Sequence, residues 1–116
     1  MCSTPSGDLD IIHPYLLNSW TNYGVVYENS EIRKNKDGLV VMSGLVKGDF
    51  SKVILKLPKG WRPNKQLIFN VISENVSKRL DINPNGELFL NKNGITGEIN
   101  GEGWVSLDGI SFYAKQ

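Results

Sequence analysis

The chain has 116 residues, a length that fits one domain and excludes a two-domain enzyme with its cleft between lobes. Thirteen Lys and Arg against twelve Asp and Glu leave a formal charge of +1, too balanced for a protein whose affinity comes from neutralising nucleic-acid phosphates. Hydrophobic residues make up 40%, enough for a soluble globular core, while twelve Gly, five Pro and twelve Asn favour turns over long helices.

The N-terminal region differs in composition from the rest of the chain. Residues 1–14 are expected to form a flexible segment or linker, because they begin with small polar side chains, and residues 15–116 a single folded head. The apolar run Leu9–Leu17 is interrupted by Pro14, which disfavours helix at the residue before it. We expect this run to pack against the core or against a neighbouring subunit.

Cys2 is the only cysteine, which excludes an internal disulfide and a cysteine-clustered zinc site. We expect neither a secretion signal nor a membrane anchor. No positively charged start precedes an apolar run, and no apolar stretch approaches the roughly 20 residues that span a bilayer.

From residue 25 onward, apolar runs recur about every ten residues with turn residues between them, which is typical of an all-β sandwich or barrel. Asp37 and Gly38 give the strongest hairpin signal, because both tolerate positive φ angles. The expected strands are Gly24–Tyr27, Glu31–Lys34, Leu39–Lys47, Ser51–Leu57, Gln66–Ser73, Val76–Ile82, Glu87–Asn91 and Trp104–Tyr113. The sequence thus predicts an antiparallel, jelly-roll-like β-sandwich of about eight short strands, with no helix longer than a turn or two.

The residue types offer little for catalysis. His13 is the only imidazole and lies beside a proline near the terminus, so neither a Ser-His-Asp arrangement nor a three-ligand metal site is expected. Glycine-rich residues 97–103 lack the Lys-Ser/Thr ending of a phosphate-binding loop. We expect a protein that is not an enzyme and that binds no metal or cofactor.

Carboxylate pairs such as Asp81 with Glu87, or Glu98 with Glu102, raise the alternative of glycoside hydrolysis. Twelve acids always permit some pair of this kind. Because each of these acids falls in a turn or on the polar face of a strand, a solvated surface carboxylate is the favoured interpretation.

The loop over residues 58–65 contains a tryptophan and two prolines, so it is expected to lie outside the sheets. Here Trp61 is a candidate to stack on a saccharide ring while Lys59, Arg62 and Asn64 donate hydrogen bonds. The alternative is that the indole folds back over the core as a lid.

Other aromatic and amide side chains divide into core and surface candidates. Five are expected in the core because they lie in or beside predicted strands: Trp20, Phe69, Phe89, Trp104 and Phe112. Tyr23 and Tyr27 are ambiguous, and the Asn residues near position 91 are ordinary turn formers before they are ligand contacts. The candidate carbohydrate-binding residues are Tyr27, Trp61, Arg62, Asn64, Asn91 and Asn93.

Four segments occur in an order that resembles one protein family. Residues 16–24 read Leu-Leu-Asn-Ser-Trp-Thr-Asn-Tyr-Gly, residues 36–48 hold the glycine hairpin, residues 57–63 read Leu-Pro-Lys-Gly-Trp-Arg-Pro, and Trp104–Phe112 closes the series. Together these segments resemble the terminal domains of bacteriophage tail fibre, baseplate and other minor structural proteins. The resemblance extends over residues 16 to 113, with Trp61 where the family usually has Tyr.

The resemblance implies a β-sandwich head that forms a homotrimer on the tail of a virion. Such a head is made in the host cytoplasm and contacts the host cell surface, often its polysaccharide, as well as other tail proteins, with no nucleic acid and no membrane insertion. The resemblance also implies that binding residues lie between the motifs, in Tyr27–Lys36, Glu74–Lys78 and Asn91–Glu102. An alternative of another class is an assembly or capping domain that touches no receptor.

Overall fold

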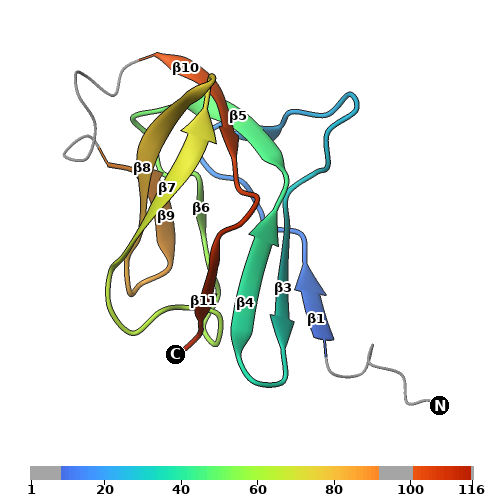
Figure 1. Cartoon of the computed structure of the whole chain (residues 1–116), viewed down its shortest axis with the longest axis vertical. Helices are drawn as coiled ribbons and strands as arrows, with labels where there is room; N and C mark the ends of the chain where they lie inside the picture. The colour runs from blue at the N-terminus through green and yellow to red at the C-terminus, as the bar shows by residue number, and fades with distance from the viewer. Residues whose placement is uncertain (1–8, 92–100, 116) are drawn as a thin grey trace.

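The computed structural model describes residues 9–91 and 101–115, in which strands, turns and loops make up the fold (Figure 1). Within these ranges no helix is long and apolar enough to span a membrane. The described residues form eleven strands, where about eight were predicted for the whole chain. They are β1 (Leu9–Ile12), β2 (Thr21–Asn22), β3 (Glu31–Asn35), β4 (Leu39–Ser43), β5 (Leu45–Asp49), β6 (Leu55–Lys56), β7 (Leu67–Ser73), β8 (Val76–Ile82), β9 (Glu87–Leu90), β10 (Glu102–Ser106) and β11 (Ser111–Tyr113).

The strands form three antiparallel sheets, with the orders β1-β3-β4-β11, β10-β5-β2 and β6-β9-β8-β7. The first two sheets are joined twice, because the chain passes from β4 into β5 and again from β10 into β11. In Figure 1 these connections run along the middle of the molecule, between the β6–β9 sheet on one side and β1, β3 and β4 on the other. The all-β, sandwich-like fold predicted from the sequence is confirmed.

Two of the predicted strands are each divided in two. Leu39–Lys47 was expected as one strand but bends at Gly44, which has a φ of 111°. Trp104–Tyr113 was also expected as one strand, but a turn over residues 107–110 separates β10 from β11. Because β5 pairs with β10 and β4 pairs with β11, the two bends lie side by side. At this place both chain segments pass between the β1-β3-β4-β11 sheet and the β10-β5-β2 sheet.

Contacts of Gly44 hold this bend. Its amide donates to Asp108 Oδ1 at 2.8 Å, and its carbonyl oxygen accepts from the Leu107 amide at 2.9 Å. A Cβ at this position would lie 2.6 Å from the carbonyl oxygen of Asn29 and 2.6 Å from Ser30 Cα. The bend therefore requires glycine for two reasons, the positive φ and the close approach of another backbone segment.

Three further predictions of local structure are wrong. Residues 24–27 form a turn and not a strand, because Gly24 and Val25 both have positive φ and the Tyr27 amide donates to the Gly24 carbonyl oxygen. Only Leu55–Lys56 of the expected strand Ser51–Leu57 forms a strand, since the chain turns after Asp49. The linker expected over residues 1–14 includes β1, which pairs with β3 and so belongs to the first sheet; residues 1–8 lie outside the described part.

All three sheets contribute buried side chains to one hydrophobic core. Trp20 belongs to this core, with 2% of its surface exposed. Its indole packs directly on Gly48, where a Cβ would lie 2.4 Å from the ring, and its Nε1 donates to the Lys52 carbonyl oxygen at 3.2 Å. The prediction that this tryptophan lies in the core is confirmed.

Substitution of Gly44 tests the bend against a matched control. Gly109 also has a positive φ, 89°, but nothing lies within 4 Å of a Cβ built there. Gly109→Ala should therefore cost about 1–2 kcal/mol of unfolding free energy from backbone strain alone. Gly44→Ala should cost about 3 kcal/mol or more, because steric overlap with the backbone of residues 29–30 is added. Urea denaturation measures both values, and equal losses would show that the close approach at residue 44 carries no cost.

Candidate functional site

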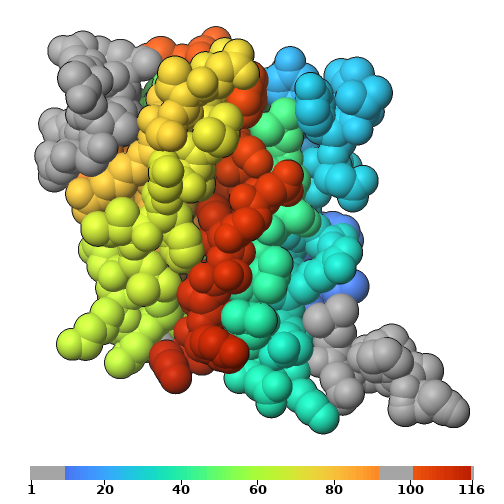
Figure 2. Space-filling view, in the orientation of Figure 1, coloured from blue at the N-terminus to red at the C-terminus, as the bar shows by residue number. Residues whose placement is uncertain are grey.

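A groove of about 690 Å³ opens between the loop over residues 23–28 and the β7–β8 hairpin. In Figure 2 the loop, in blue, and the hairpin, in yellow, rise on either side of the orange-red β10 and the green β5. The lining combines three aromatic side chains with two carboxylates, namely Tyr23, Tyr27, Trp104, Glu28 and Asp108. Residues of the bent region described above therefore form its floor.

Alternation along β5 and β10 places the floor on the outer side of the sheet. Val46 and Val105 pair with one another and are completely buried, so their neighbours along each strand point away from the core. Trp104 pairs with Lys47 in this outward row and is half-buried. The Lys47 ammonium lies 5.3 Å from the centroid of the Tyr23 ring, so the two sit side by side on the same face.

The first wall is a loop closed at its base. Asn22 Oδ1 accepts from both the amide and the hydroxyl of Ser30, at 2.7 and 2.8 Å. Leu45 of β5 holds both ends of the loop, because its carbonyl oxygen accepts from the Tyr23 amide and its amide donates to the Glu28 carbonyl oxygen. Between these points the Tyr23 and Tyr27 rings meet edge to face with centroids 5.4 Å apart. The loop is thus fixed at its base, and its tip overhangs the groove.

The tip of this loop is apolar and strained. Val25 and Val26 are 88% and 85% exposed. Val25 has a φ of 60°, a left-handed conformation that is costly for a β-branched residue. Exposed apolar side chains held in a strained backbone beside a groove are typical of a contact surface and not of a segment selected for stability.

The second wall is the β7–β8 hairpin, and Glu74 attaches it to the free edge of β10. Its Oε2 accepts from the Trp104 amide at 2.8 Å, and the Trp104 carbonyl oxygen accepts from the Ser73 hydroxyl at 2.7 Å. The carboxyl group fits because residue 103 is glycine; a Cβ there would lie 2.7 Å from Glu74 Oε2. These contacts place Ile72 and Asn75 on the side of the groove facing Tyr27.

Trp61 and Arg62, two of the residues predicted to bind carbohydrate, have structural contacts instead. Trp61 is only 8% exposed and joins the core, and the Lys34 ammonium lies 4.7 Å from its ring centroid. The Arg62 Nε donates to the Leu57 carbonyl oxygen at 2.7 Å, which holds the loop against the sheet. The lid alternative for the indole therefore describes this loop, and the expected stacking platform is absent there.

The other predicted site residues are dispersed. Tyr27 is 53% exposed and lines the groove. Asn64 is exposed in the loop that carries Trp61, outside the groove lining. Asn93 lies outside the described residues. The predicted set is therefore not brought together in one place.

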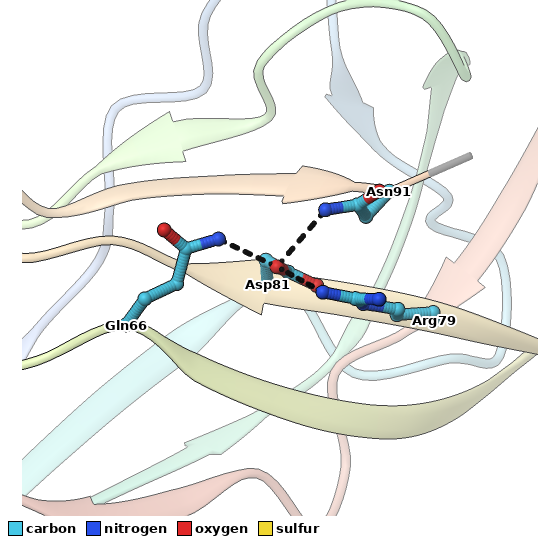
Figure 3. A network of polar contacts seen from close by, with 4 residues as sticks. All are labelled: Gln66, Arg79, Asp81 and Asn91. Carbon is cyan, nitrogen blue, oxygen red and sulfur yellow. Dashed lines mark hydrogen bonds and ion pairs between the residues drawn. The ribbon is translucent and has the colours of Figure 1, made fainter. Parts of the chain in front are cut away.

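Asn91 belongs to a polar network around a buried carboxylate (Figure 3). Asp81 is completely buried and accepts hydrogen bonds from Arg79 Nε at 2.8 Å, Gln66 Nε2 at 2.7 Å and Asn91 Nδ2 at 3.0 Å. Desolvation raises the pKa of Asp81, but these hydrogen bonds and the charge of Arg79 lower it by more, so that its pKa lies below the usual value. The network ties the start of β7 and the end of β9 to β8.

Two aromatic residues of the groove were not singled out from the sequence as binding residues. Trp104 was assigned to the core because it borders a strand, and Tyr23 was left ambiguous. The signal for Trp104 was its alternation with Val105, which the structure places on opposite sides of β10. Within residues 9–91 and 101–115, no group of three or more His, Cys, Asp or Glu side chains is arranged to hold a metal ion.

The arrangement is suited to binding an amphipathic ligand. The aromatic faces supply apolar area at low entropic cost, while the carboxylates, Asn75 and Ser106 supply hydrogen-bonding groups along the same groove. Comparison with known proteins adds no assignment, because no protein-family model, no curated protein and no solved structure matches the chain.

Asp81→Asn tests the buried network. Because folding lowers the pKa of Asp81, the network stabilises the protein above the unfolded-state value of about 3.9, and this contribution is lost as the pH falls through the folded-state pKa. At pH 7 the variant should lose about 2–3 kcal/mol of unfolding free energy. The loss should shrink as the pH falls toward 2, as measured by urea denaturation across pH. Asp37→Asn, at an exposed turn, serves as the control. A pH-independent loss at residue 81 would mean that packing, not charge, explains it.

Proposed function

We propose that this domain is a non-enzymatic, carbohydrate-binding receptor-binding module of a phage tail fibre or baseplate, which attaches the virion to polysaccharide on the host cell surface. The observation that carries the proposal is the groove lined by Tyr23, Tyr27 and Trp104. Sugar rings present apolar faces and hydroxyl edges, and a groove with aromatic faces and polar side chains matches both. The ordered motifs over residues 16–113 support the placement in a phage tail.

Homotrimerisation, which the resemblance implies, would suit a groove of this kind. The groove is open to solvent, and its aromatic side chains are only partly covered. A single site of this type binds weakly, but three linked sites convert the later contacts into intramolecular ones and raise the overall affinity.

A second candidate function is assembly or capping of the tail, and the outer face of the β1-β3-β4-β11 sheet favours it. Ile11, Val41 and Tyr113 are 48%, 39% and 55% exposed on this sheet. Ile11, Arg33 and Val41 are paired in one row across β1, β3 and β4, so the two apolar side chains flank Arg33 on one face. Exposed apolar side chains grouped on a sheet favour contact with another protein chain.

Substitution of two tyrosines of similar exposure distinguishes binding at the groove from contact at the sheet face. Tyr27 is 53% exposed and Tyr113 is 55% exposed, but only Tyr27 lines the groove. Tyr27→Ala should weaken binding to host cell-wall polysaccharide about tenfold, because an aromatic contact is worth more than about 1 kcal/mol. Tyr113→Ala should leave single-site binding unchanged. Sedimentation with purified walls and titration with wall fragments measure both. Wild-type protein that does not bind host polysaccharide, or equal losses in the two variants, would refute the proposed site.

The oligomeric state tests the role of the sheet face. Val41→Lys places a charge among its apolar side chains and should shift the assembly from trimer toward monomer by light scattering, because burying an unpaired charge is costly. Tyr27→Ala, at the groove, should remain trimeric. A trimer that persists unchanged in Val41→Lys would show that this face is not the interface.

A further inference from the structure

A second groove continues the first along the same two strands. It has a volume of about 390 Å³ and is lined in part by Thr21, Lys47, Gly48 and Glu102. The first groove takes Leu45 and Ser106 from β5 and β10, and these residues are paired with each other. The second takes the pair Gly48 and Gly103 from the same ladder.

The two grooves meet along this ladder at the pair formed by Lys47 and Trp104, because Trp104 lines the first groove and Lys47 lines the second. At about 3.4 Å per residue, Leu45 and Gly48 are roughly 10 Å apart along β5. That distance exceeds one sugar ring. A ligand in both grooves must therefore be a chain of rings that crosses the Lys47–Trp104 pair.

Among the residues that line the two grooves, three carboxylates (Glu28, Asp108 and Glu102) outnumber the one cation, Lys47, although the whole chain has a formal charge of +1. Glu28 and Asp108 line the first groove, and the residues that line it include no Lys or Arg. Glu102 lines the second and stands directly opposite Asp49 in the β5–β10 ladder. Two like charges opposite one another on adjacent strands are destabilising. Hydrogen bonds from Ser51, together with the positive charge of Lys52, hold the pKa of Asp49 below its usual value, which favours its charged form.

We propose that the two grooves form one extended site for a linear glycan that carries protonated amino groups, with the chain lying across Trp104 and its ammonium groups near Glu28 and Glu102. The inference rests on the proposed function and specifies its ligand class. A cationic group near Glu102 would offset the repulsion from Asp49, and one near Glu28 would meet two carboxylates in a groove without a lining Lys or Arg. The same carboxylates would repel an anionic polymer.

Chitosan and chitin oligomers test both parts, because they share one backbone and differ only in whether the amine is free or acetylated. Calorimetric titration of the full chain at pH 6 and low salt would compare dimers and tetramers of each. The glucosamine tetramer should bind at least about tenfold more tightly than the acetylated tetramer, and about tenfold more tightly than the glucosamine dimer.

Two single-charge variants assign the two halves of the site. Glu28→Gln should weaken binding of both glucosamine dimer and tetramer, because the dimer occupies the larger groove. Glu102→Gln should weaken only the tetramer. Asp37→Asn, at the exposed β3–β4 turn, removes the same charge away from the grooves and should change neither.

The inference is overturned if acetylated and free-amine oligomers bind equally, if the tetramer binds no better than the dimer, or if no glucosamine oligomer binds. None of these results decides the proposed function. That function is judged by wall binding in the Tyr27→Ala and Tyr113→Ala variants, which requires neither an amine nor a particular chain length.

Discussion

The bend at Gly44 is the constraint on which the other parts of the molecule depend. There the β4–β5 strand passes close to the backbone of Asn29 and Ser30, and it is fixed to the opposite turn by hydrogen bonds to Leu107 and Asp108. A glycine is required, because a side chain would occupy the space of the neighbouring backbone. One bend therefore joins two sheets into one core and turns the outer side of β5 and β10 into the floor of a groove.

The hairpins were predictable from the sequence because their signals are local. Asp37-Gly38 and the Asn-Pro-Asn-Gly turn before Glu87 mark reversals of the chain within a few residues, and the strands on either side alternate as half-buried strands do. The bends were not predictable in the same way. Gly44 looks like one more residue in an apolar run until Asn29, fifteen positions earlier, is seen to lie against it. A contact between distant segments leaves no periodic signal in either of them.

The candidate site illustrates a related difficulty with aromatic residues. Trp61 sits among prolines and glycine, which correctly indicates a loop, but the loop folds back and the ring is buried. Trp104 sits in a strand, which suggests the core, but it is on the side of the strand that faces away from the core. Composition around a residue indicates the element that holds it. Alternation along a strand divides its side chains between two faces, but which face is buried depends on what the rest of the fold covers.

Hydrogen bonds between Asn22 and Ser30 close the base of the loop over residues 23–28. Residues at this base and residues at the tip of the loop are under different constraints from the fold. At the base, the residues must pair within the sheet, allow the close approach to Gly44 and make the hydrogen bonds with Leu45. At the tip, the exposed Val25 and Val26 do not belong to the core, and their positions are set only by the conformation of the turn. Residues in such a tip can be substituted without loss of the fold, since a substitution there changes the unfolding free energy little. The tip of this loop is thus the part of the groove wall whose sequence can change independently of folding stability.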